Sequence, residues 1–176
     1  MRFSSGVRNS FEFQQVFVLA MLKPHVVLVN GSVPPPGVGY FVREASRSYA
    51  RALQLVFVEH GVTLPQFFYL RVLWSGDGIS QATLSGRIGV DRATASFVLT
   101  TMEKQGMIVR RRDPRDLRKT NIFLTARGRR LRLPLLRVAN RVNDRATRGL
   151  PAAAVEQLKS ALETIVGNLQ LPAERP

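Results

Sequence analysis

The segment 80–106 constrains the fold more than any other part of this 176-residue chain. Ser80 is placed to cap a short helix, 81–88, and Asp91 is placed to cap a second helix, 92–105. A glycine follows each helix and would end it. The two helices are separated by a turn of three or four residues that contains glycine. This spacing is typical of a helix-turn-helix motif.

After residue 106 the hydrophobic pattern changes from a helical period to alternation. Residues 107–112 and 119–124 predict two strands, and Asp113-Pro114-Arg115-Asp116 predicts the turn between them. The loop is longer than the two-residue minimum, so we expect its tip to project into solvent. The sequence therefore predicts a β hairpin directly after the helix-turn-helix.

The positive charge is concentrated in one stretch. The chain has 26 Lys and Arg against 12 Asp and Glu, a formal charge of +14. Residues 110–132 contain ten basic and two acidic residues, a net charge of +8. A charge run alone is typical of a solvated face. Next to a helix-turn-helix and a hairpin, it favours a nucleic-acid partner.

The rest of the chain from Tyr40 onward predicts helices. An apolar stripe predicts one helix that ends at Gly61, and Thr63 is placed to cap the next. A further helix, 126–148, would be kinked or interrupted at Pro134. The last helix carries a coiled-coil-like seam, which we expect to pack on a partner. The seam consists of Val155, Leu158, Leu162, Ile165 and Leu169.

Residues 1–38 differ from the rest of the chain. They include the run Pro34-Pro35-Pro36 and have poor helical periodicity. We expect an arm that is either flexible or packed on a partner subunit. The apolar run 16–22 is short and lacks a cleavage site, which disfavours a signal peptide. No apolar stretch approaches the ~20 residues of a membrane-spanning helix.

Side chains on the outer face of the helix 92–105 can contact DNA. Ala95, Val98, Leu99 and Met102 share the core face. On the opposite face, an arginine can bind guanine, hydroxyls can bind base edges or phosphates, and apolar groups can contact a thymine methyl. The predicted contacts are Arg92, Ala93, Thr94, Ser96, Phe97 and Thr100.

The hairpin supplies a second set of predicted DNA contacts. Arginine is attracted to a narrow minor groove, and basic side chains at the tip can reach phosphates. The candidates are Arg112, Arg115, Arg118 and Lys119. Asp116 is expected to order the tip, by accepting backbone N–H bonds or by pairing with Arg118. Asp116→Ala is then expected to weaken DNA binding although it raises the net charge.

At these residues the chain resembles the MarR family of winged helix-turn-helix transcriptional regulators. The resemblance covers 39–169 and is carried by three segments. These are Val90-Asp91-Arg92-Ala93-Thr94, Met102-Glu103-Lys104-Gln105-Gly106-Met107-Ile108, and Asp113-Pro114-Arg115-Asp116-Leu117-Arg118-Lys119, the last followed by Leu124-Thr125 and Gly128. The family's wing pattern is D-x-x-D-x-R, then Leu-Thr and a glycine. Phe97 departs from the family, in which this position is often polar or basic.

The resemblance implies a mainly α fold with a small β wing, in an obligate homodimer. A winged helix-turn-helix lobe, 63–125, would be joined to a helical dimerisation region, 39–62 and 126–170, with a tail at 171–176. Such a dimer binds a pseudo-palindromic operator with half-sites about 10 base pairs apart. The implied function is a sequence-specific regulator, most often a repressor that a small ligand releases.

The resemblance also implies an effector pocket between the dimerisation helices and the DNA-binding lobe. Family ligands include aromatic carboxylates and coenzyme A thioesters, and an arginine beside aromatic rings suits such an acid. The ligand candidates are Arg43, Arg47 and Phe67, although aromatic core residues and solvated arginines have the same pattern. The chain has no cysteine, which sets aside the branch that senses peroxides through a reactive thiol.

The sequence bears on three other classes of protein. An enzyme is disfavoured because no nucleophile–base pair, P-loop or dinucleotide motif occurs. With two histidines and no cysteine, we expect no metal site and no cofactor. A membrane-surface protein is disfavoured because the apolar positions are better used in a dimer. The main alternative is a non-specific nucleic-acid-binding or architectural protein. A DNA partner implies a cytoplasmic protein.

Overall fold

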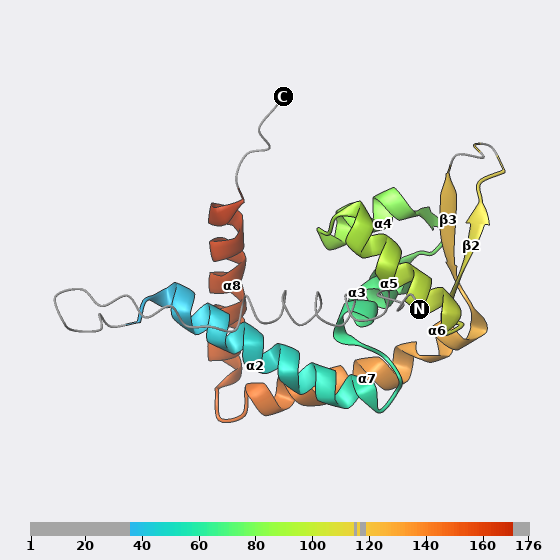
Figure 1. Ribbon diagram of the computed structural model, residues 1–176. Coiled ribbons are helices and arrows are strands. Elements are labelled where there is room, and N and C mark those ends of the chain that lie inside the picture. Colours follow the sequence, from blue (N-terminus) through green and yellow to red (C-terminus); the bar gives the residue numbers. More distant parts are fainter. Residues whose placement is uncertain (1–35, 115, 117–118, 171–176) are drawn as a thin grey trace, which may run out of the picture. The chain divides into compact units, whose positions relative to one another are not determined.

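The computed structural model describes residues 36–114, 116 and 119–170 (Figure 1). Most of the expected arm, 1–35, and the tail, 171–176, lie outside the described residues. The chain divides into two compact units, Met1–Leu55 and Val56–Pro176. In the first unit, helix α2 (Val38–Val58) begins. There, the guanidinium of Arg47 donates to Glu44 at 2.9 Å.

Three short helices follow one another near the start of the second unit, and each has a side-chain N-cap. They are α3 (Leu64–Ser75), α4 (Gln81–Ile88) and α5 (Arg92–Lys104). Thr63 forms a reciprocal capping box with Gln66, while Ser80 and Asp91 cap α4 and α5. Gly89 adopts a φ of +76°, which ends α4 and turns the chain toward α5. The predicted helix-turn-helix is therefore confirmed.

A three-stranded antiparallel sheet lies beside these helices. Its strands are β1 (Ile79–Ser80), β2 (Ile108–Arg112) and β3 (Thr120–Leu124), in the order β1-β3-β2. The predicted hairpin is confirmed, and Figure 1 shows β2 and β3 as its two arrows. Strand β1 was not predicted, because a two-residue strand has no periodicity and exists only through its pairing with Ile122 and Asn121.

The helix expected after Thr125 is interrupted, as predicted, but the break falls before the proline. Helix α6 (Ala126–Arg130) ends at Leu131, and α7 (Arg132–Ala146) begins directly after it. Pro134 has no N–H to donate to the carbonyl of Arg130, four residues earlier. The missing backbone hydrogen bond explains why the helix is interrupted between α6 and α7.

The core of the second unit is apolar and comes from most of its elements. Residues with an exposed fraction of 0% include Phe57, Leu70, Leu84, Leu99 and Ile122. Helix α8 (Ala152–Leu169) differs, because none of its residues is buried. Among the described residues, no helix is both long enough and apolar enough to cross a membrane.

Candidate nucleic-acid interface

Helix α5 presents a polar face outward, as its sequence predicts. Ala95, Val98, Leu99 and Met102 are buried. Arg92, Ala93, Thr94 and Phe97 are exposed. Phe97 is a large apolar side chain with an exposed fraction of 48%. This face therefore combines an exposed aromatic ring with small and cationic side chains, which are types that can contact base edges in the major groove of DNA.

The first turn of α5 is fixed by Asp91. The Asp91 carboxylate accepts hydrogen bonds from the backbone N–H of Thr94 at 2.9 Å and from its hydroxyl at 2.6 Å. The side-chain hydrogen bond from Thr94, followed by its backbone N–H, lowers the pKa of Asp91 below its ordinary value. The Thr94 hydroxyl thus donates into the cap while its side chain stays at the surface.

Ser96 and Thr100 are half-buried and contact a residue that sequence reasoning did not select. The Thr100 hydroxyl donates to the Ser96 carbonyl at 2.8 Å. The guanidinium of Arg110, on β2, donates to that carbonyl at 3.2 Å and to the Thr100 hydroxyl at 3.0 Å. The Thr100 hydroxyl is therefore used within the chain as both donor and acceptor. The DNA contacts of Ser96 and Thr100 stay predictions.

Asp113 holds the base of the wing tip, a role that the sequence analysis did not assign to it. The Asp113 carboxylate accepts from the backbone N–H of Asp116 at 3.2 Å and from the side-chain amide of Asn121 at 2.8 Å. Asp116 forms an ion pair with Lys119 at 3.4 Å. An aspartate at the start of a turn is a known local signal, and it could have identified Asp113.

Apart from the half-buried Arg110, the basic residues of the wing fall into two groups. Arg111, Arg112 and Lys119 are exposed. Arg115 and Arg118, which we predicted as DNA contacts, lie outside the described residues. The predicted pairing of Asp116 with Arg118 is likewise outside them.

A second missed residue, Asp77, ties the wing to the following helix. One carboxylate oxygen of Asp77 accepts from the backbone N–H of Leu124 and from the Arg129 guanidinium, both at 2.9 Å. Asp77 follows the glycine after α3, and its partners are 47 and 52 residues away. Such long-range partners leave no signal in the local sequence.

The three ligand candidates occupy different environments. Phe67 has an exposed fraction of 4%, and its ring packs 4.4 Å from Phe57 and 6.1 Å from Trp74, centroid to centroid. It is a core residue in this structure. Arg43 stacks on Tyr40, 5.6 Å from the ring centroid. Arg43 and Arg47 belong to the first unit, whereas Phe67 belongs to the second. Their ligand role stays a prediction.

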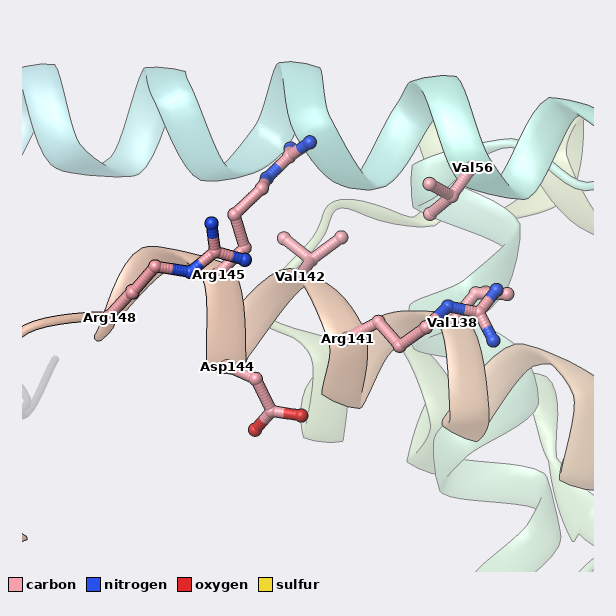
Figure 2. A pocket seen from close by; sticks show the side chains of 7 residues that line it. All are labelled: Val56, Val138, Arg141, Val142, Asp144, Arg145 and Arg148. Carbon is pink, nitrogen blue, oxygen red and sulfur yellow. The ribbon is translucent and has the colours of Figure 1, made fainter.

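A cavity of about 430 Å³ lies in the second unit (Figure 2). Val56, Val138 and Val142 supply its apolar lining, and charged residues of α7 and of the turn that follows it surround them. The charged residues are Arg141, Asp144, Arg145 and Arg148. Three arginines around an apolar lining suit an anion that has an apolar part. Within the described part of the chain, no group of three acidic, His or Cys side chains could hold a metal ion.

In sequence and in fold, the chain is similar to known transcriptional regulators. A family model described as MarR family matches residues 62–120. The HTH-type transcriptional regulator TtmR of Methylorubrum extorquens is 34% identical over 93 residues, 53% of this chain and 48% of that regulator. The match thus spans about half the length of that relative.

Two further similarities extend over more of the chain. The organic hydroperoxide resistance transcriptional regulator of Bacillus subtilis is 25% identical over 74% of this chain and 87% of its own. The solved structure of the transcriptional repressor CouR, bound to a 23-mer DNA duplex, is 27% identical. It covers 74% of this chain and 92% of its own, with a TM-score of 0.66.

Proposed function

We propose that this chain, whose residues 62–120 match the MarR family model, is a sequence-specific DNA-binding transcriptional regulator. In this proposal it is a repressor that binds a pseudo-palindromic operator as a homodimer in the cytoplasm and is released by a small ligand. The family relatives reported above are regulators, which favours a binding protein over an enzyme.

One observation carries the proposal. The exposed side chains of α5 and the exposed arginines of β2 belong to elements that pack on each other through Arg110. A helix can enter the major groove, and a basic hairpin beside it can reach the backbone or the minor groove. CouR, which has the same fold, is a repressor in complex with a DNA duplex.

The decisive experiment selects DNA from a random-sequence library with the purified full-length chain. A specific regulator enriches one duplex and prefers it over random DNA by ~10³ or more at physiological salt. An architectural protein would enrich no sequence, and random competitor DNA would displace it equally well. That second result would refute the proposal.

Arg92→Ala tests whether α5 reads bases. Losing a guanidinium that forks onto guanine is expected to cost about 1–3 kcal/mol at one base position and to relax the preference there. Arg137→Ala is the matched control, because it removes the same charge from the exposed surface of α7. Equal effects of both variants on every sequence would mean that Arg92 supplies only charge.

Arg118→Ala tests the predicted wing contact separately. A phosphate contact supplies affinity without sequence information, so binding is expected to weaken on all sequences. The salt slope of binding would fall by about one unit. An unchanged slope would contradict the contact.

Helix α8 supports the homodimer. Leu158 and Leu162 have exposed fractions of 47% and 38%, and Val166 and Leu169 are more exposed still. An apolar stripe of this kind gains stability when another surface covers it. A dimer would place two winged lobes on half-sites about 10 base pairs apart.

The cavity of Figure 2 supports an anionic effector. Its arginines would bind a carboxylate and its valines the apolar part, as an aromatic acid or its coenzyme A thioester requires. The test adds a panel of such acids to the selected duplex and measures release. Release that persists in Arg145→Gln would remove this cavity from the proposal while leaving DNA binding intact.

A further inference from the structure

Arg110 is anchored differently from the other arginines of the wing strand. Its Nη2 donates to the Ser96 carbonyl and to the Thr100 hydroxyl, at 3.2 and 3.0 Å. Its backbone N–H donates to Oε1 of Glu103 at 3.0 Å. Its neighbours Arg111 and Arg112 are exposed, whereas 24% of the Arg110 side chain is exposed. One residue of β2 therefore contacts three positions on one face of α5, over about two helical turns.

The electrostatics of Arg110 favour a fixed guanidinium. Its Nε is buried without a hydrogen-bond partner among the described residues and lies 3.7 Å from Oε2 of Glu103. The Glu103 carboxylate is close enough to stabilise the positive charge of Arg110. The two hydrogen bonds that Nη2 donates fix the orientation of the guanidinium plane. A lysine at this position would be a point charge and could not keep the same forked geometry.

These contacts connect the two elements proposed to bind DNA. Ser96 and Thr100 lie next to the exposed face of α5, and β2 leads directly into the wing tip. We propose that Arg110 is a positioning residue that fixes the orientation of α5 against the wing strand and so sets the sequence preference of the interface. Arg110 acts through Ser96, Thr100 and Glu103 without reading a base itself.

The inference rests on the proposed DNA-binding function, and the experiment separates the two. The probes are the duplex that the wild-type chain enriches and a random-sequence duplex of equal length. Failure of the wild type to enrich any duplex would refute the function. Enrichment by the wild type followed by an unchanged preference in the Arg110 variants would refute only the inference.

The central variant is Arg110→Met, which keeps an unbranched side chain and removes the guanidinium. The ratio of affinities for the selected and the random duplex is expected to fall about tenfold, with an unchanged salt slope. Arg111→Met is the matched control, because Arg111 is the exposed neighbour on the same strand. It is expected to weaken both duplexes alike and to leave the ratio unchanged.

Two further variants keep the inference testable if Arg110→Met fails to fold, as judged by thermal unfolding. Thr100→Val removes the hydroxyl that accepts from Arg110 and preserves the shape of the side chain. It is expected to lower the ratio in the same direction by a smaller factor. Arg110→Lys keeps the charge and is expected to restore only part of the preference.

The contrary results are equally definite. A wild-type ratio in Thr100→Val and Arg110→Lys would overturn the positioning role. So would an Arg110→Met variant that lowers the salt slope and weakens both duplexes alike, because Arg110 would then be a simple phosphate contact.

Discussion

The winged lobe, residues 64–124, and helix α8 use their apolar side chains in opposite ways. Each helix of the lobe buries residues against the others, and Leu70, Leu84 and Leu99 have exposed fractions of 0%. Helix α8 is longer than any of them, yet none of its residues is buried. The comparison indicates that the lobe obtains its packing within one chain, whereas α8 needs a second surface.

The largest expected effect tests the α8 half of this comparison. Leu162→Glu places a charge in the exposed stripe, and burying it in a dimer would cost several kcal/mol per chain. We expect the dissociation constant of the dimer to rise ~10³-fold or more. The measurement is sedimentation, against a chain mass of 19.7 kDa.

Ser160→Glu is the matched control, because it adds the same charge to an exposed position outside the stripe. It is expected to leave the dimer intact. If Leu162→Glu sedimented like Ser160→Glu, the stripe of α8 would not be the contact between chains.

The next effect tests whether the lobe depends on its own packing. A methyl group at Gly128 would overlap the carbonyl oxygen of Met107 and lie 3.0 Å from the Leu124 side chain. That carbonyl also accepts from Thr125, so it cannot move freely. Gly128→Ala is expected to lower the free energy of unfolding by about 3 kcal/mol, at any protein concentration.

Gly86→Ala is the control for this change. Gly86 lies within α4, and an added methyl group there would meet no atom within 4 Å. Alanine is the better helix former, so a gain of about 0.5–1 kcal/mol is expected in the same denaturation experiment. A similar loss in both variants would show that close packing at Gly128 is not the cause.

A smaller effect concerns a polar group inside the lobe. The Tyr69 side chain is 2% exposed, and its hydroxyl has no hydrogen-bond partner among the described residues. Burial, with a contribution from the charge of Asp91, raises the pKa of Tyr69 to about 12. Between pH 10 and 12 an unfolded tyrosine loses its proton while Tyr69 keeps it, so stability falls as the pH rises through this range.

The expected loss is up to about 2 kcal/mol. Denaturation of the wild type and of Tyr69→Phe across this range measures it, since phenylalanine cannot ionise. At neutral pH the variant is expected to be as stable as the wild type or more stable by about 1 kcal/mol, because an unpaired hydroxyl is removed. Parallel pH curves for the two proteins would contradict the assignment to Tyr69.

Local sequence signals were sufficient for much of the fold. Thr63, Ser80, Asp91 and Thr125 all cap helices where the sequence predicts them. A cap depends on a side chain and a backbone N–H three residues later, so both partners are visible in one short window. The buried face of α5 follows for the same reason, because helical spacing fixes which residues share a face.

The missed features depend on residues far apart in the chain. Arg110 contacts Ser96 and Thr100 across the strand–helix boundary, and Asp77 contacts Leu124 and Arg129 across the lobe. Arginine and aspartate are typical surface residues, so the sequence does not distinguish a charged side chain that joins two elements from one that is only exposed to solvent. The interaction appears only once the fold brings the partners together.

The contact between Glu103 and the backbone of Arg110 has a consequence for colloidal behaviour. Strand β2 forms one edge of the sheet, and the Glu103 carboxylate accepts the N–H of Arg110 at 3.0 Å. An open edge with free N–H groups is a template on which another chain can add a strand. Here a carboxylate takes up that donor at the middle of the edge, and its charge repels an incoming carbonyl. The Glu103 carboxylate that contacts Arg110 therefore also opposes strand addition at this edge of the sheet.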